Sequence, residues 1–335
     1  MTARIKITSL ITFAVLAAIL AATLLFKTGG NASQKIILRW GSNHAESTIT
    51  TQMMRRIIAE ANPQLGGRVE IQGFPNGALG GSRDLTEGVQ AGIVEIITEG
   101  PSQFATWIPV ASIAEAPYIY RNVEHLHKTL NGEFGARLNE EFLQKNVRIL
   151  GAFYYGTRQL STGRADIRTV NDIQGLKIRV PEVKSYMEMA AGWGAKPIPI
   201  TLGDLYLSLQ THMVDGQENP LTTFYSQKFY EIQKNIILTG HIICANMIFI
   251  NEAAWKKISS EDQSIIMQAV ANGIAWNNAE VTKQEEELKK TLAEKGVNII
   301  TPDADSFRAL AVPHLLKAME ADWGEGTWEA IQNVR

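Results

Sequence analysis

The sequence predicts an α/β fold in two units that are joined by one long helix. At 335 residues and 45% hydrophobic content, the chain can bury a large core and is long enough for two domains. Segments rich in β-branched residues alternate with segments of helical spacing, a pattern typical of sheets covered by helices. A helical pattern over 261–294 would be roughly 50 Å long, more than one unit needs, so it is expected to span both.

The shorter elements follow from local patterns. Strands are expected where apolar residues alternate or β-branched residues cluster: 35–40, 68–74, 93–98, 147–155, 176–180, 196–200 and 241–251. Helical spacing and capping residues predict helices that begin near Ser47, Asn122, Glu182 and Thr201, the first of them ending before Pro63. The segment 214–220 is expected to be a tight loop. The two units are expected to comprise 33–156 with 245–284, and 157–244 with 285–335.

The N-terminal segment differs in kind from the rest of the chain. Arg4 and Lys6 precede the uncharged apolar run 9–26, which is typical of an export signal. Residues 1–32 are therefore expected to be a signal peptide, with cleavage before Ser33. The run is also close to the lower length limit for crossing a bilayer, so a retained inner-membrane anchor stays open. Both alternatives place the remainder in the periplasm.

The composition excludes several classes of function. With 32 Lys and Arg against 34 Asp and Glu, the net charge of −2 does not point to nucleic acid, which needs a clustered basic surface. The sequence contains no nucleophile elbow, zinc-binding helix motif or glycine-rich phosphate loop, and its six histidines lack metal-ligand spacing. The single cysteine, Cys244, lies in an apolar run and is expected to be a buried core residue. We therefore expect no catalytic residues, no cofactor and no metal.

One charged residue lies inside a predicted strand. Arg179 belongs to the segment Gly175-Leu176-Lys177-Ile178-Arg179-Val180-Pro181, where a strand interior favours apolar side chains. A guanidinium keeps its proton, so its counter-charge must come from a distant carboxylate or from a ligand. On this pattern alone, an internal salt bridge and a binding site both remain open.

Other polar side chains follow predicted strands, at the edge where open α/β sheets bind ligands. Together with Arg179, Arg158 could hold a carboxylate bidentately. Groups that suit the hydroxyls of a small polar anion come from loops, helix starts and strand ends: Asn43, His44, Asp84, Glu99 and Asn219. For His44, a role within its own loop is the open alternative. These residues form the candidate ligand site.

Several motifs, spread over most of residues 35–320, resemble those of one protein family. They are Gly77-Ala78-Leu79-Gly80-Gly81, Thr98-Glu99-Gly100-Pro101, Gly156-Thr157-Arg158, the Arg179 segment, and Asp215-Gly216-Gln217-Glu218-Asn219-Pro220. On these motifs the chain resembles the organic-acid-binding solute-binding proteins of tripartite ATP-independent periplasmic (TRAP) transporters. The resemblance implies a two-lobed periplasmic binding protein with a ligand cleft between its lobes. Arg179 would be the main carboxylate clamp, Arg158 a second contact and Asn219 a polar anchor, with Glu99 and Asn43 contacting the distal part.

The resemblance also implies a function. The protein would capture a carboxylate-bearing solute and deliver it to the membrane subunits of a TRAP transporter, acting as a monomer. The groups that suit hydroxyls favour a sugar acid such as a hexuronate, with a C4-dicarboxylate or keto acid next. Leu202 stands where sialic-acid-binding members have phenylalanine, which removes a stacking surface for that ligand. Two other functions stay open: an exported sensory module, and a secreted lyase or isomerase with Glu99 or His44 as base.

Overall fold

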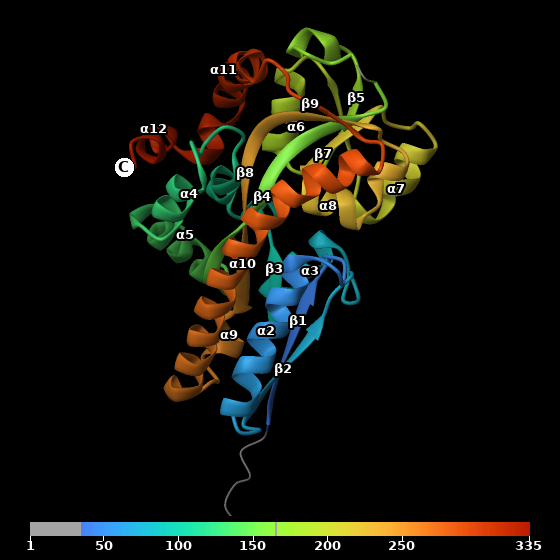
Figure 1. Ribbon diagram of the computed structural model, residues 1–335. Coiled ribbons are helices and arrows are strands. Elements are labelled where there is room, and N and C mark those ends of the chain that lie inside the picture. The colour runs from blue at the N-terminus through green and yellow to red at the C-terminus, as the bar shows by residue number, and fades with distance from the viewer. Residues whose placement is uncertain (1–34, 165) are drawn as a thin grey trace, which may run out of the picture. The chain divides into compact units, whose positions relative to one another are not determined.

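The computed structural model describes residues 35–164 and 166–335. The predicted signal peptide at 1–32 and its cleavage site lie outside these residues. From Ile37 to Arg335 the chain forms one compact unit in which helices pack around a mixed sheet (Figure 1). The fold is therefore α/β, as predicted.

The strands of the described chain form one nine-stranded sheet. Its order is β2-β1-β3-β8-β4-β7-β5-β6, and β9 pairs with β8. The strands are β1 (Ile36–Ser42), β2 (Val69–Phe74), β3 (Ile96–Glu99), β4 (Val147–Thr162), β5 (Lys177–Val180), β6 (Lys196–Pro199), β7 (Gly216–Pro220), β8 (Asn235–Asn251) and β9 (Asn298–Ile300).

Helices connect these strands and cover the sheet. The α-helices are α2 (Ile49–Gln64), α3 (Ser82–Ala91), α4 (Val123–Leu130), α5 (Glu133–Gln144), α6 (Lys184–Gly192), α7 (Leu202–Gln210), α8 (Leu221–Ser226), α9 (Glu252–Trp255), α10 (Ser260–Glu294), α11 (Ala304–Trp323) and α12 (Thr327–Gln332). Short 3-10 helices are η1 (Pro101–Phe104), η2 (Pro109–Glu115), η3 (Val170–Ile173) and η4 (Phe229–Glu231).

The two longest strands, β4 and β8, pair antiparallel in the middle of the sheet. Both extend beyond the predicted segments 147–155 and 241–251. Their register shifts between Tyr154 and Gly156, where Gly156 has a φ of 135° that favours glycine. The predicted boundary after residue 156 falls at this irregularity, and the division of the chain into two lobes at that point stays a prediction.

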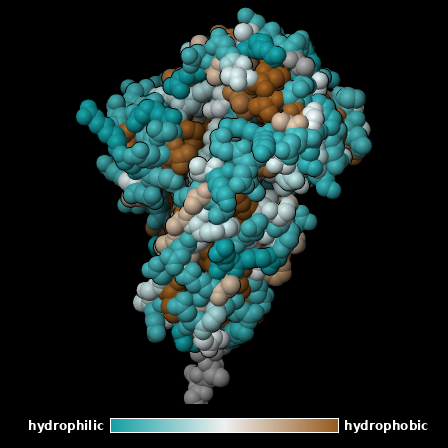
Figure 2. Space-filling view, viewed as in Figure 1, coloured by the Kyte–Doolittle hydropathy of each residue, from teal (hydrophilic) through white to brown (hydrophobic). Residues whose placement is uncertain are grey.

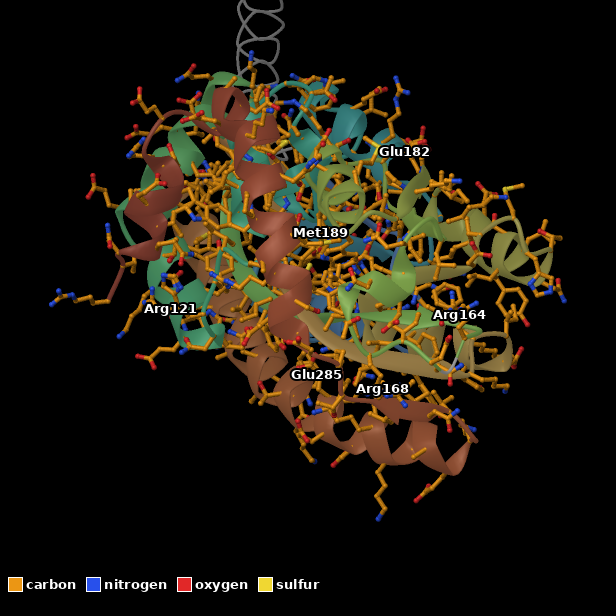
Figure 3. All side chains as sticks on the ribbon, turned by 90° about the horizontal axis from the view of Figure 1, so that it is seen from above. Arg121, Arg164, Arg168, Glu182, Met189 and Glu285 are labelled. Atoms are coloured by element: carbon orange, nitrogen blue, oxygen red, sulfur yellow. The ribbon has the colours of Figure 1, made fainter. Side chains whose placement is uncertain are left out.

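The long helix α10 lies along β4 and contacts α2 and α8 (Figure 1). Its predicted start is confirmed, because the Ser259 hydroxyl accepts a hydrogen bond from the backbone N–H of Asp262. Glu285 of α10 (labelled in Figure 3) accepts hydrogen bonds from the Tyr154 hydroxyl at 2.5 Å and the Thr157 N–H at 2.6 Å. Glu285 thus ties the helix to β4 on both sides of Gly156.

Replacement of Glu285 by alanine is expected to lower the free energy of unfolding by about 1–3 kcal/mol, because it leaves the Thr157 N–H without its acceptor and leaves the Tyr154 hydroxyl with the Thr157 hydroxyl alone as partner. Denaturant unfolding of the purified protein measures this change. Glu286, the neighbouring acid, has a side chain that is 74% exposed, so Glu286→Ala is the matched control, expected to change stability by under about 0.5 kcal/mol. Equal effects of the two substitutions would contradict the role of Glu285.

Three local predictions were wrong. Pro63 lies inside the last turn of α2, where the missing N–H costs one hydrogen bond close to the helix end. One helix was expected over 122–137; it begins at Asn122 as predicted, but the segment forms two helices, α4 and α5, separated by a turn at Asn131 and Gly132. The expected loop at 214–220 contains strand β7, which pairs with β4 and β5. This strand was missed because strands were predicted from hydrophobic patterns, and its residues are mostly polar.

One hydrophobic cluster is centred on Phe104, Phe142 and Phe249, whose ring centroids lie 4.7 to 5.0 Å apart. Trp323 and Trp328, from α11 and α12, belong to the same cluster. The C-terminal helices therefore pack with residues that the prediction placed in the other unit.

A second hydrophobic cluster lies under α7 and α8. Its members include Leu205, Leu209, Phe224 and, from α10, Leu288 and Leu292. The helix α10 therefore contributes to this second cluster, while its N-terminal part packs on α2. Its length lets it reach both.

The face drawn in Figure 2 is mainly hydrophilic, with apolar areas among the polar ones.

Candidate functional site

A cavity of about 1010 Å³ contains the candidate site. It is lined by all seven residues that the sequence singled out: Asn43, His44, Asp84, Glu99, Arg158, Arg179 and Asn219. They come from the loop after β1, the start of α3, the end of β3, and strands β4, β5 and β7. The fold therefore brings these residues into one place, while their roles in binding stay predictions.

Arg179 is 3% exposed and lies on β5. Its Nε donates to the carbonyl oxygen of Ile200 at 2.8 Å, and no carboxylate in the described part of the chain forms an ion pair with it. Burial, with the repulsion of the Arg158 charge adding to it and Glu218 opposing it, lowers the pKa of Arg179 to about 10. A buried guanidinium without an anion is ready to receive one.

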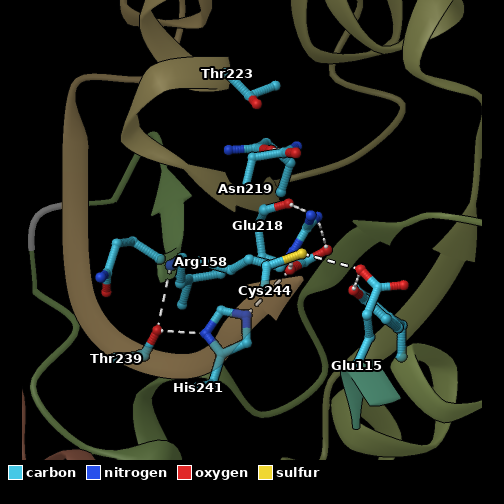
Figure 4. Close-up of polar contacts among 12 residues, drawn as sticks. Glu115, Arg158, Glu218, Asn219, Thr223, Thr239, His241 and Cys244 are labelled. Atoms are coloured by element: carbon cyan, nitrogen blue, oxygen red, sulfur yellow. Dashed lines mark hydrogen bonds and ion pairs between the residues drawn. The ribbon is translucent and has the colours of Figure 1, made fainter. Parts of the chain in front are cut away.

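An internal salt bridge was one of the two alternatives for Arg179, but it is Arg158 that forms one. Its Nε and Nη2 donate to the two carboxylate oxygens of Glu218 at 2.5 and 2.8 Å (Figure 4). Nη2 also donates to the Glu218 carbonyl oxygen, and the guanidinium carbon lies 5.1 Å from the centre of the Tyr186 ring. Arg158 lines the cavity with its charge already balanced.

Glu218 is fully buried and belongs to a larger polar network. His241 Nε2 lies 3.1 Å from its carboxylate, and the His241 Nδ1 pairs with the Thr239 hydroxyl at 2.7 Å (Figure 4). Burial alone would raise the pKa of Glu218, but the charge of Arg158 and the hydrogen bond to His241 bring it down to about 2. Glu218 is therefore ionised at any physiological pH.

Asn219 is positioned by a chain of side-chain amides. Its Nδ2 donates to Gln217 Oε1 at 2.6 Å, and Gln217 Nε2 donates to the Ser161 hydroxyl at 2.7 Å. These bonds explain how β7 carries polar residues in the interior of a sheet, because each buried group has a partner.

On the other side of the cavity, three predicted residues already have partners. Asn43 Nδ2 donates to the Ser82 hydroxyl at 2.7 Å, and Asp84 accepts from the Gly81 N–H at 3.0 Å. His44 Nδ1 lies 2.8 Å from the Ser42 hydroxyl, and Nε2 lies 3.2 Å from Asn246 Nδ2. Burial lowers the pKa of His44 to about 4, so it is a neutral donor and acceptor. These groups are held in fixed orientations along the cavity wall.

Glu99 is 4% exposed and has no cationic partner among the described residues. One oxygen accepts from the Gly100 N–H at 3.3 Å, while Oε1 has no hydrogen-bond partner. Burial raises the pKa of Glu99 to about 8, against the hydrogen bonds from Ser82 and Gly100. At neutral pH Glu99 therefore carries a proton.

Replacement of Glu99 by glutamine is expected to make the ligand-free protein relatively more stable as the pH rises. An acid whose pKa is raised by folding keeps its proton in the native state and loses it on unfolding, so wild-type stability falls between about pH 4.5 and pH 8. Glutamine removes this loss. Melting temperatures of both proteins from pH 5 to pH 8.5 measure the difference, with Glu286→Gln as a surface control. A constant difference across this range would contradict the raised pKa.

Sequence reasoning missed several residues that line the cavity: Ser82, Glu115, Tyr155, Tyr186 and Asn246. Glu115 is 4% exposed and accepts hydrogen bonds from the Ser102 hydroxyl and from the thiol of Cys244. Cys244 is buried, as predicted, but it also lines the cavity. The signal for Glu115 was present, since it is a lone acid in the apolar run 113–117.

The comparisons with known proteins identify the class to which this fold and cavity belong. Residues 40–322 match the family described as bacterial extracellular solute-binding protein, family 7. The chain belongs to this family, which includes the solute-binding proteins of TRAP transporters, as the motifs predicted.

Individual relatives are similar along nearly the whole chain. The sialic acid-binding periplasmic protein SiaP of Vibrio cholerae is 34% identical over 305 residues, which cover 91% of this chain and 94% of SiaP. The 2,3-diketo-L-gulonate-binding periplasmic protein YiaO of Escherichia coli is 28% identical over 292 residues, which cover 87% of each chain. A TRAP periplasmic solute-binding protein of Roseobacter denitrificans, solved with bound L-galactonate, has a TM-score of 0.83 at 29% identity, covering 90% of this chain and 99% of that one. The two-lobed architecture of such binding proteins is thus the architecture of this chain.

Two negative observations apply to the described residues alone. In 35–164 and 166–335 no helix combines the length and apolar character that crossing a membrane requires. The same residues contain no cluster of His, Cys, Asp and Glu side chains suited to hold a metal ion.

Proposed function

We propose that this protein captures a carboxylate-bearing small molecule in the periplasm and delivers it to the membrane subunits of a TRAP transporter. The observation that carries the proposal is Arg179, a buried guanidinium in the cavity that no carboxylate of the described chain neutralises. A ligand carboxylate would form a charge-assisted, bidentate pair with it. Asn219 would hold the ligand near this end, and Asn43 and Glu99 would contact its distal part. Closure of the two lobes would bury the pair further.

A sugar acid is the favoured ligand, ahead of a C4-dicarboxylate or a keto acid. Amide, hydroxyl and carboxyl groups from Asn43, Ser82 and Glu99 line the far side of the cavity and suit the hydroxyls of such a molecule. The relatives support this class, since the Roseobacter denitrificans structure contains L-galactonate. Leu202 also lines the cavity, where it offers no aromatic stacking surface, which argues against the ligand of SiaP.

Thermal shift measurements against a panel of aldonates, uronates, keto acids and C4-dicarboxylates test the proposal. A ligand present at 100 times its Kd stabilises the native state by about 2.7 kcal/mol, which gives a clear rise in melting temperature. The ligand should be recovered chemically unchanged, because the protein is proposed to bind without catalysis. If none of the carboxylates stabilises the protein, the proposal is overturned.

Two further expectations concern the oligomeric state of the protein and the position of its mature N-terminus. Light scattering after size exclusion should give the mass of a monomer. Mass spectrometry of the protein from the periplasmic fraction should show whether the N-terminus begins near Ser33 or retains residues 1–32.

A further inference from the structure

The helix α7 begins beside Arg179, at the wall of the cavity. Strand β5, which carries Arg179, pairs in parallel with β6, and α7 follows β6 after a connection of two residues. The Nε of Arg179 donates to the carbonyl oxygen of Ile200, which belongs to this connection, at 2.8 Å. Residues 200–203 line the cavity together with Arg179. The first turn of α7 and the buried guanidinium therefore face the same space.

The first turn of α7 has backbone N–H groups without acceptors. The Thr201 hydroxyl is the N-cap and accepts from the N–H of Asp204. A helix leaves its first N–H groups without partners inside the helix, and those of Leu202 and Gly203 have no acceptor among the described residues. A side chain at Gly203 would have only the Thr201 hydroxyl within 4.0 Å of its Cβ. A ligand can therefore approach the backbone of this turn.

The side chain of Arg179 points to a ligand at the same place. It is 3% exposed, and its two Nη nitrogens make no hydrogen bond to the described residues. Buried donors cost free energy unless an acceptor reaches them. The guanidinium and the first turn of α7 thus form one set of donors that a ligand can satisfy together.

The donors near Arg179 outnumber the lone pairs of one carboxylate. A carboxylate accepts about four hydrogen bonds. The two Nη nitrogens of Arg179 would supply two of them. Nη1 of Arg158, which makes no bond to Glu218, and the N–H of Asn219 that is not bound to Gln217 could supply the others. The N–H of Leu202 is then left for a different oxygen of the ligand.

We propose that the backbone N–H of Leu202 binds an oxygen on the ligand carbon next to the carboxylate. This inference rests on the proposed function and narrows its substrate class to acids that carry a hydroxyl, keto or ring oxygen on that carbon. An acid without this oxygen leaves the N–H unpaired when the cleft closes, and an unpaired buried donor weakens binding. A site built to bond a ligand oxygen rejects the analogue that lacks it for this reason.

Ligand pairs that differ by this oxygen test the proposal. Calorimetric affinities of the wild type are compared for D-glycerate with 3-hydroxypropanoate, D-erythronate with 3,4-dihydroxybutanoate of matching configuration, and L-galactonate with its 2-deoxy form. In each pair the second acid lacks only the oxygen on the carbon next to the carboxylate. Wherever the first acid binds, the second is expected to bind at least about 10-fold more weakly.

Substitutions at Leu202 locate the donor. Proline is favoured at the first helical position, and Thr201, with a φ of −61° and a ψ of 157°, has the backbone that a residue before proline needs. Leu202→Pro therefore removes one N–H and should keep the fold, while the preference for the oxygenated acid falls below about 3-fold. Leu202→Ala shortens the half-buried side chain but keeps the N–H, so it should retain the wild-type preference.

A second variant is available if Leu202→Pro does not fold. Gly203→Ala places a methyl group in the open space of the same turn, where it would obstruct the ligand oxygen. It should also narrow the preference between the members of each pair. Melting temperatures of the ligand-free variants show which of them are folded.

The possible failures are distinguishable. Equal affinity of the wild type for both members of a pair would overturn the role of the Leu202 N–H and leave the proposed function intact. A preference that persists in folded Leu202→Pro, or in Gly203→Ala where that variant replaces it, would overturn the assignment to this turn. A wild type that binds none of the six acids and no other carboxylate would overturn the proposed function as well.

Discussion

Replacement of Arg179 by lysine is expected to weaken carboxylate binding by about 2 kcal/mol or more, roughly 30-fold, while the melting temperature of the ligand-free protein hardly changes. Lysine keeps the charge but loses the planar fork that matches a carboxylate bidentately. The ligand-free protein loses little, because Arg179 makes one hydrogen bond, to the Ile200 carbonyl, and no ion pair within the described chain. Its lowered pKa reflects a cation that burial disfavours.

Calorimetric affinity and apo melting temperature, measured on the same Arg179→Lys preparation, test this expectation. Arg164→Lys is the control, since Arg164 (labelled in Figure 3) has a side chain that is 46% exposed and pairs with Asp166 outside the cavity. It should change neither quantity. Unchanged affinity together with a lowered melting temperature would show that Arg179 supports the fold rather than the ligand.

Replacement of Glu218 by glutamine, unlike Arg179→Lys, is expected to destabilise the ligand-free protein. The free energy of unfolding should fall by about 3–5 kcal/mol. Glu218 neutralises Arg158 and accepts from His241 in a fully buried network. Glutamine fills the same space but removes the charge, so Arg158 becomes a second buried cation without an anion beside Arg179. Removing one partner of a buried ion pair lowers the free energy of unfolding strongly, because the other charge stays buried without a partner. Replacing the whole pair by apolar residues of similar size has a much smaller effect.

Denaturant unfolding at pH 7 and at lower pH measures this effect. Because folding lowers the pKa of Glu218 to about 2, its stabilisation is complete above about pH 4.5 and is lost as the pH falls toward 2. The gap between wild type and Glu218→Gln should therefore close over this range. Glu124→Gln removes an exposed pair with Lys128 and should cost under about 0.5 kcal/mol at pH 7. A gap that does not depend on pH would contradict the assignment of the effect to the Glu218 charge.

The candidate site was predictable to the extent that its residues break a local pattern. Arg179 was identified because a cation does not belong in a strand interior, and Asn219 because it precedes a proline in a run of polar residues. Glu115 broke a pattern in the same way but was missed, since no strand end or helix start marked its position. Tyr155 and Tyr186 could not be recognised, because an aromatic residue in a strand or helix looks the same whether it faces a core or a cavity.

By itself, the sequence determined the α/β class, the long helix over 261–294, and the family, because hydrophobic periodicity, capping residues and motifs are local properties. Only the tertiary structure decided which arginine is neutralised. Arg158 reaches Glu218 because β4 and β7 pair with Leu160 opposite Glu218, and this register joins residues 60 positions apart. Strand pairing of this kind depends on side-chain contacts between distant segments, which no local pattern encodes. The same pairing turned an expected loop into β7 and left Arg179 as the buried cation without an anion.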